Sequence, residues 1–354
     1  MYDREPLDFS VLDVNTAGAA LDDVRTLLGD GGLGMDADIR QFVVARSGKR
    51  MVGCAGIAGN VIKCVAVAAD FRGDNLSARL LAEVEIMAVR QGHFHLFLYT
   101  RPANIEVFRG CGFYPLAQWD QVAVLMENTP VGISLYARSL AQYYHPGNAI
   151  GAVVMNANPF TLGHRYLAEQ ASAASDWLHI FVVGEDVSLF PYAERLEMVK
   201  QGVAHLGNVT VHAGSDYLIS RATFPGYFLR DAQLISQTFS AIDLLIFRNH
   251  IAVPLGITHR FVGTEPFCPM THQYNQDMYD WLENPARSTK PPVRVVEIER
   301  KRQASGQAIS ASEVRMLLKR GDLARIRSIV PASTFAYLKQ PRLPEPVGSY
   351  VLGI

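Results

Sequence analysis

The chain of 354 residues lacks the features that mark membrane, secreted and nucleic-acid-binding proteins. No apolar run reaches about 18 residues, so no segment is expected to span a bilayer. The first five residues, MYDRE, do not begin the apolar stretch of a signal peptide. Lysine and arginine total 33 against 34 acidic residues, a net charge of −1. This balance favours neither a nucleic acid nor a membrane surface as a partner.

Cysteine is also scarce, and the sequence contains no Cys-x-x-Cys pair. The four cysteines stand in apolar surroundings, at Cys54, Cys64, Cys111 and Cys268. Such cysteines are expected to be reduced core residues, which is typical of a cytoplasmic protein.

What the sequence does have is a regular alternation in its second half. Strand-like runs are predicted at 150–155, 178–183, 208–212, 242–247 and 293–298. Helical runs alternate with them at 164–174, 192–205, 228–239, 274–283 and 311–319. This order predicts βαβ units, hence an α/β fold with a parallel sheet and helices on both faces.

The first half has a different pattern. Alternating segments at 42–44, 51–58 and 61–68 predict an antiparallel meander, followed by a helix at 75–91, a strand at 95–99 and a short helix to Gly110. The polar, turn-forming stretch 143–148 is the best linker between the halves. We therefore predict an α+β domain at 1–145, a parallel α/β domain at 146–342 and a tail at 343–354.

The stretch with the most chemical content, residues 156–164, follows the predicted strand 150–155 and opens a helix. The first N–H groups of a helix lack partners and the helix dipole favours an anion there, so this turn suits a phosphate. Asn158 stands in the turn, Gly163 leaves room for close approach, and His164 can donate to a phosphoryl oxygen. Thr161-x-Gly163-His164 alone is equally explained as an ordinary strand-to-helix turn.

A second motif, Ile309-Ser-Ala-Ser-Glu-Val-Arg315, opens another predicted helix. Ser310 with Glu313 fits a capping box, which needs no ligand. The alternative is that Ser310 or Ser312, together with Arg315, binds phosphates, because the arginine fork donates two bonds at once and stays charged. Taken singly the cap is favoured, and taken with the first motif phosphate binding is favoured.

Together the two motifs resemble the (T/H)xGH and ISxSxxR signatures of the HxGH-type nucleotidyltransferase superfamily, which implies a Rossmann-like parallel sheet. Asn158 departs from the Asp that many members carry before the proline. More closely, nearly the whole chain resembles the family of ligases that acetylate the acyl carrier subunit of citrate lyase. That resemblance rests on 153–165, 190–192 with 195–200, 255–267, 274–275 and 309–315, with 96–113 upstream.

The family resemblance implies a reaction and its partners. ATP with Mg²⁺ and acetate would give an acetyl-adenylate, which the thiol of the carrier's dephospho-coenzyme A-derived prosthetic group then attacks. Thr161 and His164 would contact the phosphates near the α-phosphorus, while Ser310, Ser312 and Arg315 would hold the departing pyrophosphate. The same resemblance raises phosphate roles for Arg195 and Lys200, and places Glu265 near the ribose or metal.

The order of elements before residue 145 resembles the GNAT-type N-acetyltransferase fold. Arg72 and Gly73 correspond to that family's coenzyme A pyrophosphate loop, and Asn104 begins its later helix. Asn75 and Ser77 stand where small residues are usual, and a Cβ at 75 is expected to restrict the backbone of a phosphate nest. A relaxed coenzyme A cleft would suit the carrier's prosthetic arm, and a purely structural domain is the alternative.

Two patterns are set aside. Residues 29–34 satisfy Gly-x-Gly-x-x-Gly, but 24–28 looks like a helix end and no acidic ribose partner follows, so a helix C-cap and loop is favoured. His93 and His95 lie on one side of a predicted strand, a spacing that can bind metal. No third ligand is in view, so packing is favoured and no protein metal site is predicted.

Three other functions stay open. An adenylyltransferase acting on a pantetheine phosphate uses the same two motifs. An N-acetyltransferase with a degenerate nucleotide domain is disfavoured by Asn75 and Ser77. A non-catalytic scaffold for the lyase is disfavoured by the intact phosphate motifs.

Overall fold

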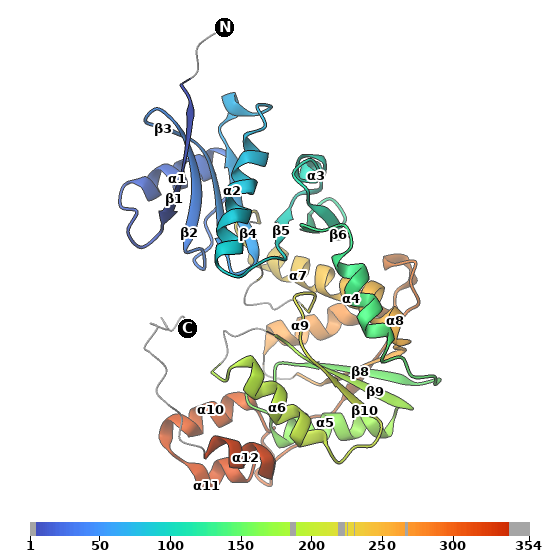
Figure 1. Ribbon diagram of the computed structural model, residues 1–354. Coiled ribbons are helices and arrows are strands. Elements are labelled where there is room, and N and C mark those ends of the chain that lie inside the picture. Colours follow the sequence, from blue (N-terminus) through green and yellow to red (C-terminus); the bar gives the residue numbers. More distant parts are fainter. Residues whose placement is uncertain are drawn as a thin grey trace. The chain divides into compact units, whose positions relative to one another are not determined.

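The computed structural model describes residues 5–184, 189–218, 224, 226–229, 231–265 and 268–339. The chain forms two compact units, drawn in Figure 1. Unit 1 comprises Met1–His145, Asp216–Ile257 and Pro266–Val295, and unit 2 comprises Pro146–Ser215, Thr258–Glu265 and Val296–Ile354. Two segments of the predicted second domain thus pack with unit 1, and the sequence domains 1–145 and 146–342 stay a prediction. The predicted tail, 343–354, lies outside the described residues.

In the described part of unit 1, seven strands form one sheet in the order β1-β2-β3-β4-β5-β7-β6. They are β1 (Leu7–Asp13), β2 (Gln41–Ser47), β3 (Arg50–Ala58), β4 (Val61–Val67), β5 (Phe97–Thr100), β6 (Tyr114–Trp119) and β7 (Ala123–Glu127). The meander predicted over 42–68 is confirmed, because β2, β3 and β4 pair antiparallel. Gly48 and Gly59, each at φ +57°, let the chain reverse in the two turns.

Helices cover this sheet. The predicted helix 75–91 is α2 (Leu76–Arg90), which packs against β2, β3 and β4 because Leu80, Val84 and Met87 recur on one buried face. α1 (Ala20–Asp30) contains the helix end expected before the glycine-rich loop, with Gly31 as its C-cap. The remaining helices in the described part of unit 1 are η1 (Ala69–Phe71), η2 (Pro102–Asn104), α3 (Ile105–Arg109), α4 (Gly132–Ala141), α7 (Ala232–Ile246), η4 (Phe247–Ala252), α8 (Val253–Leu255), α9 (Pro269–Met278), η5 (Tyr279–Glu283) and η6 (Pro285–Arg287), of which α7 packs against β6 and β7.

The strand predicted over 242–247 is wrong, because these residues end α7 and begin η4. Five of the six residues are buried and apolar, the exception being Asp243. A short apolar run fits a buried helix as well as a buried strand, so periodicity could not separate the two. The predicted helix 228–239 is also displaced: α7 begins after Asp231, whose carboxylate accepts the Leu234 N–H at 2.8 Å.

The described strands of unit 2 form a five-stranded sheet in the order β10-β9-β8-β11-β12. They are β8 (Ile150–Met155), β9 (Trp177–Val182), β10 (Val209–His212), β11 (His259–Gly263) and β12 (Arg294–Ile298). β8 pairs parallel with β9 and β11, and β9 pairs parallel with β10, which confirms the predicted parallel sheet. β11 was not among the predicted strands.

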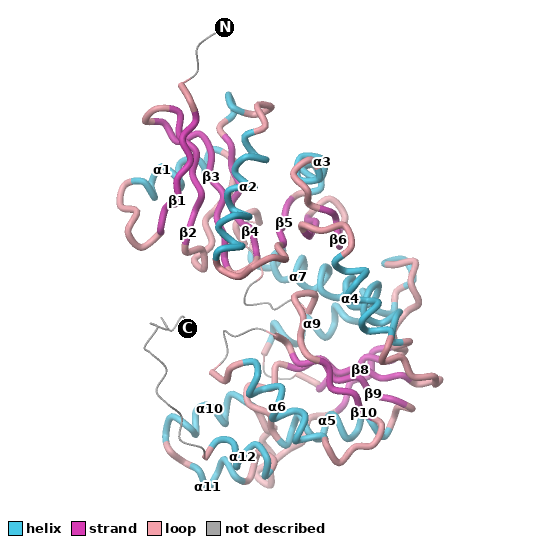
Figure 2. The backbone as a smooth tube through the Cα atoms, viewed as in Figure 1, coloured by secondary structure: helices cyan, strands magenta, loops and turns pink. Residues whose placement is uncertain are grey.

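The strand order of unit 2 reverses direction at β8. After β8 the chain runs to β9 and β10 on one side, and it returns later to β11 on the other side. Ligands of such sheets bind at the carboxyl ends of the strands where this reversal occurs. The helices α5 (Leu162–Ala173) and α6 (Tyr192–Val203) pack against the sheet (Figure 2), and α10 (Ala311–Arg320), α11 (Leu323–Arg327) and α12 (Ala332–Leu338) follow it.

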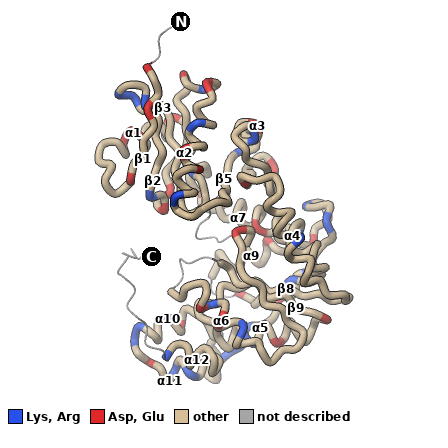
Figure 3. The backbone as a smooth tube through the Cα atoms, in the orientation of Figure 1, with Lys and Arg blue, Asp and Glu red and all other residues tan. Residues whose placement is uncertain are grey.

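Charged residues of both signs are interspersed along both units, with several basic residues on α10 and α11 (Figure 3). No helix in the described ranges has the length and apolar character needed to cross a membrane. All four cysteines lie in the described residues, and none of them forms a disulfide. Cys54 and Cys64 are buried as expected, whereas Cys111 and Cys268 are only half-buried.

The core of unit 2 contains a pair of buried histidines. His179 Nδ1 and His212 Nε2 lie 2.9 Å apart on neighbouring strands β9 and β10, and the His212 ring stacks on Phe181. Burial lowers the pKa of His212 from its usual 6.5 to about 4. The folded state therefore disfavours the protonated imidazole, and the unfolded state binds more protons between about pH 4 and 6.5.

We expect this histidine to make the protein less stable in acid. Its contribution is fully present above pH 6.5 and is lost as the pH falls to 4, a loss of about 3 kcal/mol. Urea unfolding measured between pH 4 and 7 should depend less on pH in His212→Gln than in the natural chain. The exposed His205→Gln is the control. An unchanged slope in His212→Gln would contradict the assignment.

Candidate nucleotide site

Thr161 and His164 lie at the N-terminus of α5, directly after the turn that leaves β8. Thr161 Oγ1 accepts the His164 N–H at 3.3 Å, and His164 Nδ1 accepts the Thr161 N–H at 3.0 Å. This reciprocal capping box uses Nδ1 as an acceptor, so the neutral imidazole carries its proton on Nε2. Within the described residues Nε2 has no hydrogen-bond partner, which leaves one N–H donor at the helix start.

His164 is neutral at physiological pH. Burial, together with the positive charge of Arg300, lowers the pKa of His164 from 6.5 to about 4. The ring stacks on Phe160, with centroids 5.7 Å apart and planes inclined by 18°, and this contact and the hydrogen bond at Nδ1 fix its orientation. A fixed, neutral N–H donor can stabilise charge that develops on a phosphoryl oxygen without itself losing a proton.

The second motif opens α10. Ser310 is the N-cap, and its Oγ accepts the Glu313 N–H at 3.1 Å. The reciprocal half of the capping box is replaced, because the Glu313 carboxylate accepts from Gln303 at 2.8 Å and pairs with Arg325 at 3.1 Å. Ser310 therefore does act as the cap that the sequence allowed, which leaves a ligand role for its hydroxyl as a prediction.

The structure brings the two motifs together. Arg315 Nη1 donates to the backbone carbonyl of Asn158 at 2.6 Å, and Nη2 donates to Ser312 Oγ at 2.8 Å. A Cβ added to Gly163 would lie 3.2 Å from the Ile309 carbonyl, so a side chain at 163 would press on the second motif. The starts of α5 and α10 therefore lie side by side, with His164 and Arg315 on the same end of the sheet.

The predicted basic residues of α6 have different surroundings. Arg195 is fully buried, and its guanidinium donates to the carbonyls of Asn156, Val183 and Phe190 at 2.8 to 3.1 Å. It thereby ties the turn after β8 to the loop after β9. Lys200 is exposed near the C-terminal end of α6. Phosphate contacts of either residue stay a prediction.

Glu265, which was predicted near the ribose or metal, follows β11 and is 9% exposed. It pairs with Arg300, whose Nε also donates to the Thr264 carbonyl at 2.6 Å. Arg300 belongs to no motif that the sequence analysis recognised. In the parts of the chain that the structure describes, no group of three or more His, Cys, Asp or Glu side chains is placed to hold a metal ion.

Unit 1 contains a cleft of about 730 Å³ where β4 and β5 separate. These strands pair only at Val61–Phe97 and Ile62–Leu98, so the backbone beyond those pairs lines the cleft. All three predicted arm-binding residues, Arg72, Gly73 and Asn104, line it as well. Lining residues Tyr227 and Phe228 come from the later segment 216–257.

The loop before α2 corrects one expectation. Asn75 adopts φ +58° and ψ +18°, the left-handed conformation, and Gly73 has φ +91°. A Cβ at 75 therefore does not prevent the turn, because asparagine enters this region more readily than other residues with a side chain. The observed backbone therefore does not support the expectation that Asn75 restricts the phosphate loop.

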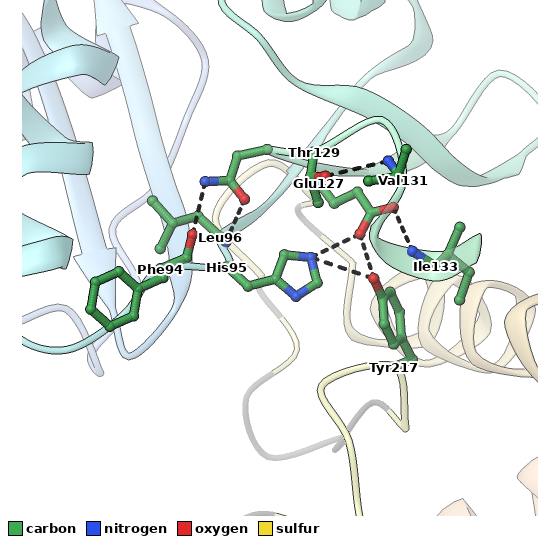
Figure 4. Close-up of polar contacts among 9 residues, drawn as sticks. Phe94, His95, Leu96, Glu127, Thr129, Val131, Ile133 and Tyr217 are labelled. Atoms are coloured by element: carbon green, nitrogen blue, oxygen red, sulfur yellow. Dashed lines mark hydrogen bonds and ion pairs between the residues drawn. The ribbon is translucent and has the colours of Figure 1, made fainter. Parts of the chain in front are cut away.

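His95 belongs to a hydrogen-bond network with Glu127 and Tyr217. Its Nε2 lies 2.8 Å from Glu127 Oε2, which also accepts from the Tyr217 hydroxyl at 2.6 Å (Figure 4). The other carboxylate oxygen accepts the Ile133 N–H at 3.1 Å, and these bonds lower the pKa of Glu127 against the effect of burial. The network fastens the segment that begins at 216 to β7 and to the start of α4, so packing explains His95.

Comparison with known proteins identifies the families that the chain matches. The family description "Citrate lyase ligase C-terminal domain" matches residues 150–338, and "Acetyltransferase (GNAT) domain" matches residues 34–123. A [citrate [pro-3S]-lyase] ligase of Escherichia coli K12 is 49% identical over 90% of this chain and 90% of its own.

Two further proteins are similar over different extents. A [citrate [pro-3S]-lyase] ligase of Klebsiella pneumoniae is 48% identical over 87% of this chain and 89% of its own. The crystal structure of E. coli ElaA covers 34% of this chain and 99% of its own, at 15% identity and a TM-score of 0.32. The identity and coverage of the two ligases show that the chain belongs to the citrate lyase ligase family.

Proposed function

We propose that the chain is an AMP-forming acid–thiol ligase that activates citrate lyase. It uses ATP and acetate to acetylate the thiol of the dephospho-coenzyme A-derived prosthetic group on the acyl carrier subunit. The names of the relatives supply the lyase as the target. The observation that supports the chemistry is the meeting of the His164 and Arg315 motifs beside the carboxyl end of β8. We propose a cytoplasmic location, in keeping with four cysteines that form no disulfide in the described residues.

The proposed reaction has two steps. An acetate oxygen attacks the α-phosphorus of ATP in line, and the bond to pyrophosphate breaks. The carrier thiolate then attacks the acetyl carbonyl, and AMP leaves. No protein nucleophile is needed, so catalysis rests on positioning and on stabilising charge.

Each motif has a part in the first step. The Nε2–H of His164 contacts an oxygen near the α-phosphorus, with Thr161 fixing the imidazole. The N-terminus of α10, with Ser310, Ser312 and Arg315, holds the pyrophosphate. Mg²⁺, carried mostly by the nucleotide and water, would supply positive charge to the phosphates. Holding the metal through the nucleotide and water suits this site, because the carboxylate of Glu265 already pairs with Arg300.

The cleft of unit 1 is proposed to hold the carrier's prosthetic arm. A cleft of this size suits an extended small ligand. The loop from Arg72 to Asn75, with two left-handed residues, offers N–H groups to the arm's phosphates. Asn104 is oriented by its bond to Thr100 Oγ1 at 3.1 Å.

A substitution at Arg72 tests this role separately from adenylation. In Arg72→Gln we expect the KM for the deacetylated carrier to rise roughly 3- to 10-fold, because an exposed cation near a phosphate mainly favours encounter. Acetate-dependent exchange of pyrophosphate into ATP should be unchanged. The control is Arg90→Gln, an exposed arginine at the C-terminal end of α2. An unaltered KM in Arg72→Gln would remove Arg72 from the arm site.

The experiment that tests the function measures AMP release from ATP and acetate, with and without deacetylated carrier. Carrier-dependent AMP release with formation of the acetyl thioester is the expected result. AMP joined to phosphopantetheine, with pyrophosphate release that needs no acetate, would instead establish an adenylyltransferase. Consumption of acetyl-coenzyme A without ATP would establish an acetyltransferase. Tight carrier binding without turnover would leave only a scaffold.

A further inference from the structure

Arg300 stands where β12 ends, at the same edge of the sheet as the two phosphate motifs. The end of β12 is bound to the loop after β11, because the Thr264 N–H donates to the Ile298 carbonyl at 3.0 Å. The next residue after Arg300, Lys301, accepts the Ile309 N–H at 3.1 Å. The Ile309 carbonyl in turn lies against Gly163. These contacts connect the segment of Arg300 to the start of α5 through Ile309.

The guanidinium of Arg300 is held in one orientation. Its Nε donates to the Thr264 carbonyl at 2.6 Å, and Nη2 pairs with Glu265, a residue that is 9% exposed. Within the described residues, Nη1 makes no hydrogen bond. The side chain as a whole is 29% exposed, so one edge of the planar fork remains accessible while the other is fixed.

We infer that Arg300 is a further phosphate ligand of the nucleotide site, contacting the triphosphate beside His164 through Nη1. The inference rests on the proposed function, since it names a third cationic or donor group for the same ATP. Glu265 then acts as a positioning residue, which holds the fork of Arg300 toward the site. The lowered pKa of His164, to which the charge of Arg300 contributes, is independent support for their proximity.

The chemistry fits the ligand class. Arginine remains charged at all relevant pH values and presents donors along both edges of its fork. An arginine with one edge bound to protein is preorganised, so little conformational freedom is lost when the second edge meets a phosphate. A hydrogen bond between charged partners is among the stronger polar contacts, and its loss typically weakens binding about 10- to 100-fold.

The test compares Arg300→Gln with Arg302→Gln in the full-length protein. Arg302 lies two residues away on the same segment, is more exposed, and pairs loosely with Glu299 at 3.8 Å. The readouts are acetate-dependent pyrophosphate–ATP exchange, with KM for ATP and for pyrophosphate, and the NMR titration of His164. In Arg300→Gln both KM values should rise about 10- to 100-fold, and the pKa of His164 should rise. Arg302→Gln should match the natural protein in all readouts.

A merely structural Arg300 would behave differently. Arg300→Gln would then lower the amount of active protein, and hence the apparent kcat, while both KM values stayed unchanged, and this outcome overturns the inference. Arg300→Lys, which keeps the charge without the fork, should restore part of the affinity. If the natural protein shows no exchange at all, the proposed function itself fails, and that result is distinct from unchanged KM values in the variant.

Discussion

His164→Ala is expected to slow acetate-dependent pyrophosphate–ATP exchange by at least about 100-fold. The reason is that its Nε2–H is a neutral donor fixed by Thr161 and by stacking on Phe160. A fixed donor stabilises charge in the transition state more than in the ground state, so its removal should reduce kcat rather than raise KM for ATP. The measurement is the exchange rate under saturating ATP and acetate.

The matched control is His205→Ala. His205 lies in the same unit, and its Nε2 is 3.0 Å from Glu169 on a surface where its side chain is 42% exposed. This variant should exchange pyrophosphate at the natural rate. Circular dichroism should show both variants folded, because His164→Ala loses one half of a capping box, worth about 1 kcal/mol. Near-natural exchange by His164→Ala would show that it has no part in the reaction.

Arg195→Met is expected to lower the free energy of unfolding of unit 2 by about 3–5 kcal/mol. The guanidinium is fully buried and donates to several carbonyls, so its loss leaves buried acceptors without partners. The same change should reduce exchange activity. Without the bond from Arg195 to the Asn156 carbonyl, the turn would no longer hold the Asn158 carbonyl where Arg315 binds it.

Urea unfolding followed by fluorescence measures this effect. The control is Arg320→Met, since Arg320 is exposed in the last turn of α10. If Arg195→Met were as stable as the natural chain but bound ATP weakly, the residue would be a nucleotide ligand and not a structural support. That result would favour the phosphate role that the family resemblance implied.

Local sequence predicted most of the framework of unit 2. The strand at 150–155 was correct to the residue because an apolar run is bounded by Asn148 and Asn156, which favour turns. β11 escaped prediction because His259 and Arg260 interrupt its apolar character, although Arg260 is only 5% exposed. Its strand state comes from pairing with β8, a contact that is distant in sequence.

The sequence predicted the separate segments of the site but not the contacts that bring them together. Helix starts at Thr161 and Ser310 follow from local capping rules, and both side chains do cap. The bond between Arg315 and Asn158 joins residues 157 positions apart, so spacing alone could not reveal it. Arg300 gave no signal because it stands in the basic run Arg300-Lys301-Arg302, which is typical of a solvated segment after a strand. Only the fold brings it near His164.

The division of the chain also bears on how the protein is made. Unit 1 includes Pro266–Val295, and Glu283 of that segment accepts the Val295 N–H at 2.7 Å. Tyr227, from the middle of the chain, donates to the Tyr99 carbonyl at 2.6 Å inside the same unit. On the ribosome, the amino-terminal fold therefore stays incomplete until residue 295 has emerged. Nascent chains that stall earlier should expose the apolar surface that 216–257 covers, and should depend on chaperones.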